Sequence, residues 1–506
     1  MAELELDTLE SKGLIRIATI DPELEYLFRH ALVQDAAYES LLKQERRSLH
    51  RLVGDALEEL YPDRHGELAA VLARHFEQAG ENDKAIAYLI AAAQFANERN
   101  AITEAFELYG RAAALLPPAS ASDDQALRRR RLEIELGRSK AGFSFRSEQQ
   151  TLSILEPLIA PAAQLGDLRL EAEVHLGIAL ARQFRGARSD TDPILLRSLD
   201  RVSEIARELG DPLIGALPQS ILGLFQVFTG RLREGVASLS AAAPLLEQKH
   251  DFVGSSFALV ALAIGLARMG EFEAAEEAAR RASDVGERGD LIAKLDALIG
   301  ESSVRSIRGD LDGAVPLAMQ CTALAEETGA TACVVASNFV LGDAYLRQGD
   351  FSAARIAFER GDQVANTIDE RVFRPSIAAY LRSTAASMGE FGPTTQTFDE
   401  ALAEARQIED HWGEAHVVWK RADTESKRVE RDERQMLSDY AAAADGFERM
   451  GARPYLARVL RDWGNALRAI GRTSEGDEKL RAALELFNEL GISREAAAVR
   501  EVIAAS

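Results

Sequence analysis

Residues 341–358 read LGDAYLRQGDFSAARIAF, and this stretch decides the fold. Small residues at Gly342 and Ala354, with a large one at Phe358, flank a turn at Gly349. Small residues let two helices approach closely, and large ones fill the space between neighbouring helix pairs. The stretch therefore predicts two packed helices joined by a tight turn.

The same frame recurs along the chain at a period of about 40 residues, which indicates stacked structural units. The turn inside each unit falls at Gly230, Gly270, Gly309, Gly349, Gly389 and Gly471. The turn at the end of each unit falls at Gly166, Gly210, His250-Asp251, Gly289, Gly329, Asp369, Asp410, Gly451 and Gly491. One unit cannot bury its apolar face alone, so neighbours stack into a solenoid, and solenoids usually bind partners along an extended surface.

The composition narrows the class of protein. The chain has 506 residues, a net charge of −22 and a pI of about 5.0, and such an acidic chain repels phosphate backbones. The only cysteines, Cys321 and Cys333, argue against a disulfide-built fold. The longest apolar run, 257–267, is shorter than the roughly 20 residues that cross a bilayer, and the acidic start lacks a signal peptide pattern. We expect a cytoplasmic protein with no nucleic-acid or membrane partner.

Residues 1–60 differ from the rest of the chain. A short helix precedes a β-hairpin at about residues 14–28, and a long helix follows from about Ala31, with Leu32, Leu49 and Leu52 on its apolar side. We interpret this segment as a partial winged-helix unit. The remaining segments are the first helix pairs (61–118), a linker (119–125) and the repeat array (126–506) with a capping helix from about Ser493. The predicted fold is all-α, a right-handed α-α superhelix with a small N-terminal hairpin.

The repeats resemble the tetratricopeptide family. That family has Leu-Gly-x2-Tyr in the first helix and Ala-x3-Phe in the second. Leu341-Gly342-x2-Tyr345 and Ala354-x3-Phe358 match both patterns. The period here is longer than the usual 34 residues, which indicates longer helices. The longer variant is similar to the sensor arms of large bacterial signalling ATPases.

A second resemblance lies in residues 28–42, FRHALVQDAAYESLL. This segment resembles the end of the winged-helix part of bacterial STAND-class ATPases, especially those fused to class III nucleotide cyclases or protein kinases. In that family a winged-helix histidine senses bound ADP, and the resemblance implies this role for His30 if a nucleotide-binding domain is present.

The sequence carries no motif for nucleotide chemistry. It has no Gly-x4-Gly-Lys-Ser/Thr loop and no kinase or cyclase motif set. His411 and His416 are five residues apart, which does not place them on one helix face as in His-x3-His zinc sites, so we interpret them as a surface pair. We therefore expect no enzymatic activity, no cofactor and no metal.

One apolar set is a candidate partner-binding surface. Its members lie on the first helices of two adjacent units: Leu217, Leu224, Val227, Phe228, Phe257, Val260 and Ile264. The alternative interpretation is that these side chains form the core between repeats. An apolar concave patch is how a helical solenoid would hold a peptide or a small effector.

Together these features predict a non-catalytic sensor or scaffold arm of a STAND-type ATPase or adenylate cyclase signalling protein. It would bind a protein or peptide partner, or a small effector, and we favour a monomer. The alternative is a free-standing tetratricopeptide-repeat adaptor that mediates protein–protein interaction.

Overall fold

The computed structural model describes residues 2–19, 25–99, 101–118, 124–143, 145–184, 192–248, 252–289, 291–392 and 397–504. The strands in these ranges are β1 (Ile15–Thr19) and β2 (Glu25–Phe28), which pair antiparallel with Ile15 opposite Phe28. Helices make up nearly all of the other described elements. The predicted all-α class with a small N-terminal hairpin is confirmed.

Contacts divide the chain into two compact units. Unit 1 comprises residues 1–96 and 107–120, and unit 2 comprises 97–106 and 121–506. The expected linker, 119–125, falls mostly on residues outside the described ranges.

Unit 1 combines the hairpin with the first helices. They are α1 (Ala2–Ser11), α2 (Ala31–Ser40), α3 (Lys43–Leu60), α4 (His65–Ala79), α5 (Asn82–Glu98) and part of α6 (Ile102–Leu115). The prediction of one long helix from Ala31 is wrong, because the chain is extended at Leu41 and Leu42. The cause is a new helix start: the Leu42 backbone N–H donates to the Glu45 carboxylate at 2.8 Å, which satisfies one of the first N–H groups of α3.

Most of the apolar residues predicted to form the buried side of this helix are exposed. Leu32 is 81% exposed and Leu52 is 64% exposed. The contact of α3 with α4 instead runs through Gly54, where a Cβ atom would lie 2.9 Å from the ring of Phe76. Leucine spacing alone could not reveal which side of α3 meets α4, because the absence of a side chain at Gly54 decides it.

Unit 2 is an array of antiparallel helix pairs. Its first helices are α7 (Gln125–Gly142), α8 (Glu148–Leu155), α9 (Ile159–Leu165), α10 (Leu168–Phe184) and α11 (Pro193–Leu209). The regular pairs follow: α12 (Pro212–Phe228) with α13 (Leu232–Gln248), α14 (Phe252–Met269) with α15 (Phe272–Arg288), α16 (Leu291–Arg308) with α17 (Leu311–Thr328), and α18 (Thr331–Gln348) with α19 (Phe351–Ile368).

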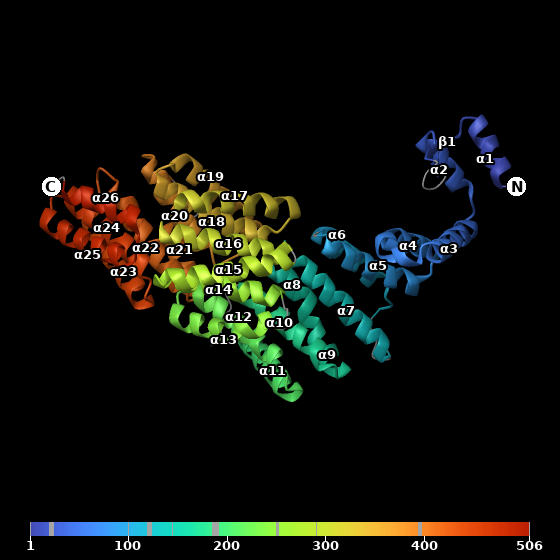
Figure 1. Ribbon diagram of the computed structural model, residues 1–506, viewed down its shortest axis with the longest axis horizontal. Coiled ribbons are helices and arrows are strands. Elements are labelled where there is room, and N and C mark those ends of the chain that lie inside the picture. Colours follow the sequence, from blue (N-terminus) through green and yellow to red (C-terminus); the bar gives the residue numbers. More distant parts are fainter. Residues whose placement is uncertain are drawn as a thin grey trace. The chain divides into compact units, whose positions relative to one another are not determined.

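The array continues through α20 (Arg374–Ser387) with α21 (Phe398–Gln407), α22 (His411–Ser426) with α23 (Glu433–Met450), and α24 (Arg453–Ala469) with α25 (Thr473–Glu489), followed by α26 (Ser493–Ala504). In Figure 1 these pairs follow one another from the green α12 to the red α26. Each first helix also contacts the first helix of the next pair, as α14 does with α16. The core is therefore a continuous strip of side chains between pairs.

Several repeat-end turns adopt a left-handed backbone, which reverses the chain within one or two residues. Gly329 provides it with φ 76°, and Asp369 provides it with φ 55° without being glycine. At Gly289 φ is −89°, so the period alone did not determine the conformation of every turn.

Two further findings concern composition. Cys321 and Cys333 are both buried and unbridged, as their Ala/Val-rich surroundings predict. In the described part of the chain, no helix has the length and apolar character needed to cross a membrane.

Candidate functional site

The seven residues of the predicted partner-binding surface lie together in unit 2, on α12 and α14. Leu224, Val227, Val260 and Ile264 are buried in the core between repeats. Leu217, Phe228 and Phe257 are partly exposed and pack against that core. Only the last three therefore present surface that a partner could touch without opening the helix pairs.

The C-terminal pairs of unit 2 lie against the turns of its earlier pairs, and we call this contact the seam. Three turn glycines with φ near 90° lie there: a Cβ atom would clash at Gly230 and Gly270 and would be tightly packed at Gly309. Their neighbours are Met450 at Gly230, Leu490 at Gly270, and Ile492 at Gly309. The backbone N–H of Trp412 also donates to the carbonyl of Thr229 at 3.3 Å. Residues about 180 positions apart thus meet backbone to backbone.

A buried arginine reinforces the seam. Arg268 on α14 donates from Nη1 to the carbonyl oxygen of Val227 at 2.7 Å. Its guanidinium lies 3.7 Å from the centre of a Trp412 ring on α22. Burial lowers the pKa of Arg268 to about 10, so the side chain stays charged at neutral pH. A charge stacked on an aromatic face in a desolvated site contributes about 2 kcal/mol.

Asp410, which precedes α22, is buried beside this arginine. One carboxylate oxygen accepts the backbone N–H of Gly413 at 2.8 Å and caps the helix. Burial raises the pKa of Asp410 to about 7, although the Gly413 hydrogen bond and the charge of Arg268 act in the opposite direction. The seam therefore contains a carboxyl group that titrates near neutral pH.

His416 is buried, so the interpretation of His411 and His416 as a surface pair is wrong for His416. Its ring lies 4.9–5.7 Å from those of Tyr380, Trp412, Trp419, Phe447 and Tyr455. Burial, and secondarily the charge of Lys420, lowers the pKa of His416. A neutral imidazole that bonds the Tyr380 hydroxyl at 3.1 Å serves packing, because the ring cannot reach solvent.

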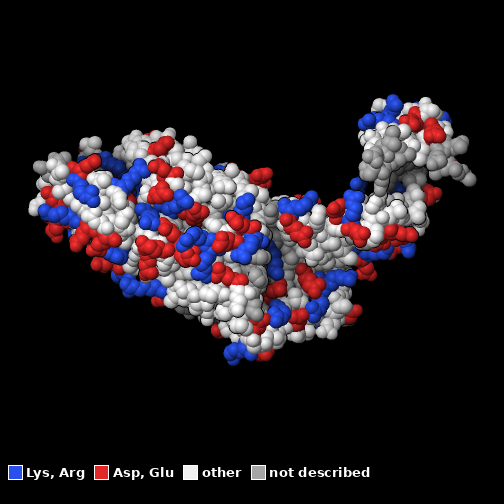
Figure 2. Space-filling view, in the orientation of Figure 1, with Lys and Arg blue, Asp and Glu red and all other residues white. Residues whose placement is uncertain are grey.

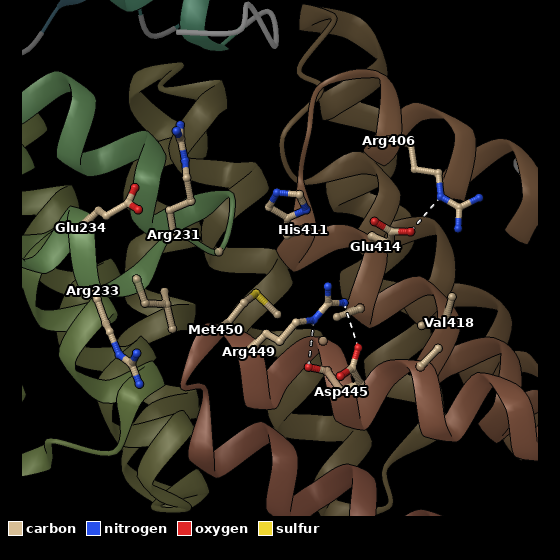
Figure 3. Close-up of a pocket in the computed structure, with 15 residues that line it drawn as sticks. Arg231, Arg233, Glu234, Arg406, His411, Glu414, Val418, Asp445, Arg449 and Met450 are labelled. Atoms are coloured by element: carbon tan, nitrogen blue, oxygen red, sulfur yellow. Dashed lines mark hydrogen bonds and ion pairs between the residues drawn. The ribbon is translucent and has the colours of Figure 1, made fainter. Parts of the chain in front are cut away.

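A groove opens along the edge of the seam, with a volume of about 460 Å³. One wall is the turn from α12 into α13, and the other wall is formed by α21, α22 and α23 (Figure 3). Val418 and Met450 contribute apolar surface. The volume lies in the range of small-molecule and short-peptide sites.

Charged side chains surround this groove. Arg406 pairs with Glu414 at 2.8 Å, and Arg449 pairs with Asp445 at 3.0 Å, as the dashed lines in Figure 3 mark. Arg233 is exposed and makes no hydrogen bond or ion pair within the described ranges. Apolar surface bordered by mixed charges suits a peptide, whose side chains need both kinds of contact. Figure 2 shows acidic and basic side chains mixed over the visible face of unit 2 as well.

His30 lies in unit 1, directly before α2, and is exposed. Its side chain makes no capping hydrogen bond to that helix. The implied nucleotide-sensing role stays a prediction.

The seam and the groove were not predicted from the sequence. The available signal was the spacing of the turn glycines, which showed where turns are but not what faces them. Gly349, Gly389 and Gly471 belong to the same series, and the structure places no described atom within 4 Å of a Cβ built there. Only the earlier glycines of the series meet the C-terminal pairs.

Solved structures with a similar fold are known. The structure of a Rap protein complexed with competence and sporulation factor matches with a TM-score of 0.54 at 11% identity, over 71% of this chain and 98% of that chain. The apo form of the quorum sensor NprR from B. thuringiensis matches with a TM-score of 0.43 over 70% of this chain and 98% of that one. A STAND protein with a tetratricopeptide repeat sensor from Pyrococcus horikoshii matches with a TM-score of 0.40 over 81% of this chain and 58% of that one.

Comparison with known sequences gives less information about this chain than the structural comparison does. No protein-family model matches this chain. A curated but uncharacterised protein of Rhizobium meliloti (strain 1021) is 31% identical over 117 residues, which are 23% of this chain and 11% of that protein. The chain thus matches about a tenth of that protein's length. The architecture that the match to the Rap structure and the helix pairs establish is a tetratricopeptide-like helical repeat array.

Proposed function

We propose that the chain is the non-catalytic sensor or scaffold arm of a STAND-type signalling protein and that unit 2 binds a protein or peptide partner. The observation that carries the proposal is the groove beside the seam, where apolar surface and charged side chains from distant repeats meet. The Rap fold, seen in complex with competence and sporulation factor, supports a peptide or protein ligand. The segment 28–42 supports the STAND assignment through its family resemblance.

The geometry also suggests how such an arm would report binding. The groove is built from pairs that are distant in sequence and meet at the seam, so a ligand that contacts both walls stabilises the seam. A ligand shifts a conformational equilibrium only by its difference in affinity for the two states. A partner that touches both walls has such a difference, because an open seam separates them.

The test uses groove variants that leave the core intact. Arg233 and Ala442 line the groove and are exposed, so Arg233→Glu and Ala442→Phe change its charge and its space. Affinity capture from the native cell extract, followed by mass spectrometry, should recover a partner with the unaltered chain and lose it with both variants. Arg434→Glu is the matched control, because Arg434 on α23 is also exposed and makes no ion pair with any described residue. Equal capture by all four proteins would show that the groove is not the contact.

A further inference from the structure

Three arginines from two helices converge on one carboxylate in unit 2. Arg458 on α24 donates to both oxygens of Glu495, from Nε at 2.7 Å and from Nη2 at 3.1 Å. Arg347 on α18 donates from Nη2 at 3.2 Å, and Arg461 on α24 approaches from Nη1 at 3.5 Å. We call Arg347, Arg458 and Arg461 the cradle.

Most of the cradle is buried, and two of its arginines are held by backbone carbonyls. The Arg458 side chain is 2% exposed and that of Glu495 is 10% exposed. Arg458 also donates to the carbonyl of Ile307 at 2.6 Å, and Arg347 donates to the carbonyl of Ser306 at 2.6 Å. Both arginines are therefore fixed on α16 whether or not the carboxylate is present, and their geometry is preorganised for an anionic group.

The electrostatics favour an ionised carboxylate in the cradle. Burial alone would raise the pKa of Glu495, but Arg347 and Arg458 reverse this effect and hold the pKa well below its usual value. Glu495 is the counter-charge of Arg458. Burial alone would lower the pKa of Arg458, but the Glu495 carboxylate raises it above its usual value. Without a carboxylate in the cradle, the buried arginines would have one fewer counter-charge, which would destabilise the folded state.

The helix that delivers this carboxylate is short and buries few side chains. α26 packs on α25, and its buried residues are Glu495, Ala496 and Val499. Two of these three side chains are small or medium apolar groups. The remaining polar links lie at the surface, as does the hydrogen bond from Arg468 to the Val502 carbonyl. Glu495 is thus the buried polar anchor of α26.

We propose that the cradle is a binding site for a glutamate-bearing helix of a protein partner, and that α26 occupies it when no partner is bound. The exchange replaces one carboxylate by another, so the ion pairs of the cradle are conserved and only the modest packing of α26 is lost. The proposal rests on the proposed function, since it names the chemical group of a partner and a regulation of unit 2.

The probe is a dye-labelled peptide with the sequence of residues 493–504, and binding is measured by fluorescence anisotropy with the full chain. Glu495→Ala removes the competing carboxylate, so this chain should bind the peptide at least tenfold more tightly than the unaltered chain does. The double variant Glu495→Ala/Arg458→Met should lose that gain. A peptide with glutamine at the position of Glu495 alone should not bind, because an amide supplies no charge.

One control variant and one replacement variant complete the test. Glu501→Ala on the exposed side of α26 should behave like the unaltered chain. If Glu495→Ala does not fold, as judged by circular dichroism, Glu495→Gln replaces it, since it conserves the shape of the side chain. Equal binding of the glutamate and glutamine peptides, or no binding by a folded variant, overturns the proposal.

Hydrogen exchange tests displacement in the unaltered chain. The backbone amides of α26 should exchange at least tenfold faster than those of α24, because α26 opens without the rest of unit 2. Equal exchange rates in the two helices would show that α26 is fixed core and would overturn the proposal. Failure here leaves the groove variants unaffected, so the proposed function is tested separately.

Discussion

Gly342 lies directly against the ring of Phe358: a Cβ atom at Gly342 would come within 2.5 Å of Cε1. These residues are 16 positions apart on α18 and α19, and they stand where the repeat frame requires a small and a large residue. The contact fixes how closely the two helices approach. It therefore also fixes where a larger residue is least tolerated.

Gly342→Leu should destabilise the chain more than Gly329→Leu. A leucine at 342 overpacks a close helix contact, which costs about 3 kcal/mol or more at the upper end of such effects. Gly329 has φ 76°, and the Thr103 hydroxyl is the one described atom near a Cβ there, so the loss is mainly backbone strain of about 1–2 kcal/mol. Urea denaturation measures both losses. Equal losses, or a larger one at Gly329, would mean that the repeat frame is misplaced.

Gly270→Ala should open or strain the seam. Both Gly270 and Gly471 have positive φ, so alanine costs similar backbone strain at either position. At Gly270 the added methyl group also meets Leu490, whereas at Gly471 it meets no described atom. Gly270→Ala should therefore lose about 1–3 kcal/mol more than Gly471→Ala. Urea melts give the difference, and small-angle scattering shows whether the radius of gyration rises. Identical stabilities would show that the seam does not form in solution.

Asp410 should make the stability of unit 2 depend on pH near neutrality. Its pKa of about 7 in the folded chain lies above the unfolded value near 4, so the folded state keeps a proton that the unfolded state has lost. The stability that Asp410 contributes is fully present below its unfolded pKa of about 4. It falls as pH rises from about 4 and is lost once pH passes the folded pKa of about 7. Relative to Asp410→Asn, the chain should lose roughly 1.4 kcal/mol per pH unit over this window.

Urea melts at pH 5, 6, 7 and 8 measure this dependence. Asp432→Asn is the control, because Asp432 caps α23 through the Gln435 backbone N–H but is exposed. Parallel curves for the chain and Asp410→Asn would contradict the expected titration.

The chain should bind neither ADP nor ATP. It has no glycine-rich phosphate loop, and its charge of −22 disfavours an anionic ligand at long range. His30, exposed before α2, supplies one contact and cannot offset a triphosphate alone. Isothermal calorimetry should show no heat of binding. Micromolar affinity that disappears in His30→Ala would reveal a working nucleotide pocket.

The sequence predicted what depends on neighbours in the chain. Gly342, Phe358 and the turn glycines mark helix pairs because helix packing and turn conformation are local, and the structure confirms this architecture. The hairpin at residues 14–28 is also confirmed. The break at Leu42 was missed, because a capping carboxylate at Glu45 is a weaker signal than a run of apolar residues.

The candidate site depended on contacts that no local pattern contains. Phe228 was selected as an apolar residue on a first helix, and the structure places its ring 5.5 Å from that of Phe373. Arg268 and Trp412 are likewise 144 positions apart and carry no shared motif. Their meeting follows from the accumulated curvature of several helix pairs, which small changes in each packing angle would alter.

The seam also affects how the protein unfolds. An open solenoid behaves as a one-dimensional chain, in which each repeat contacts only its neighbours and the ends fray first. Here Gly230, Gly270 and Gly309 contact Met450, Leu490 and Ile492, so the pairs from α12 to α25 form a closed circuit of contacts that does not include α26. A closed circuit has no free end. Removing or adding one helix pair would misalign all of the seam contacts at Gly230, Gly270 and Gly309 at once. The number of repeats in this stretch is therefore a fixed property of the molecule, and its loss of structure is a single cooperative event.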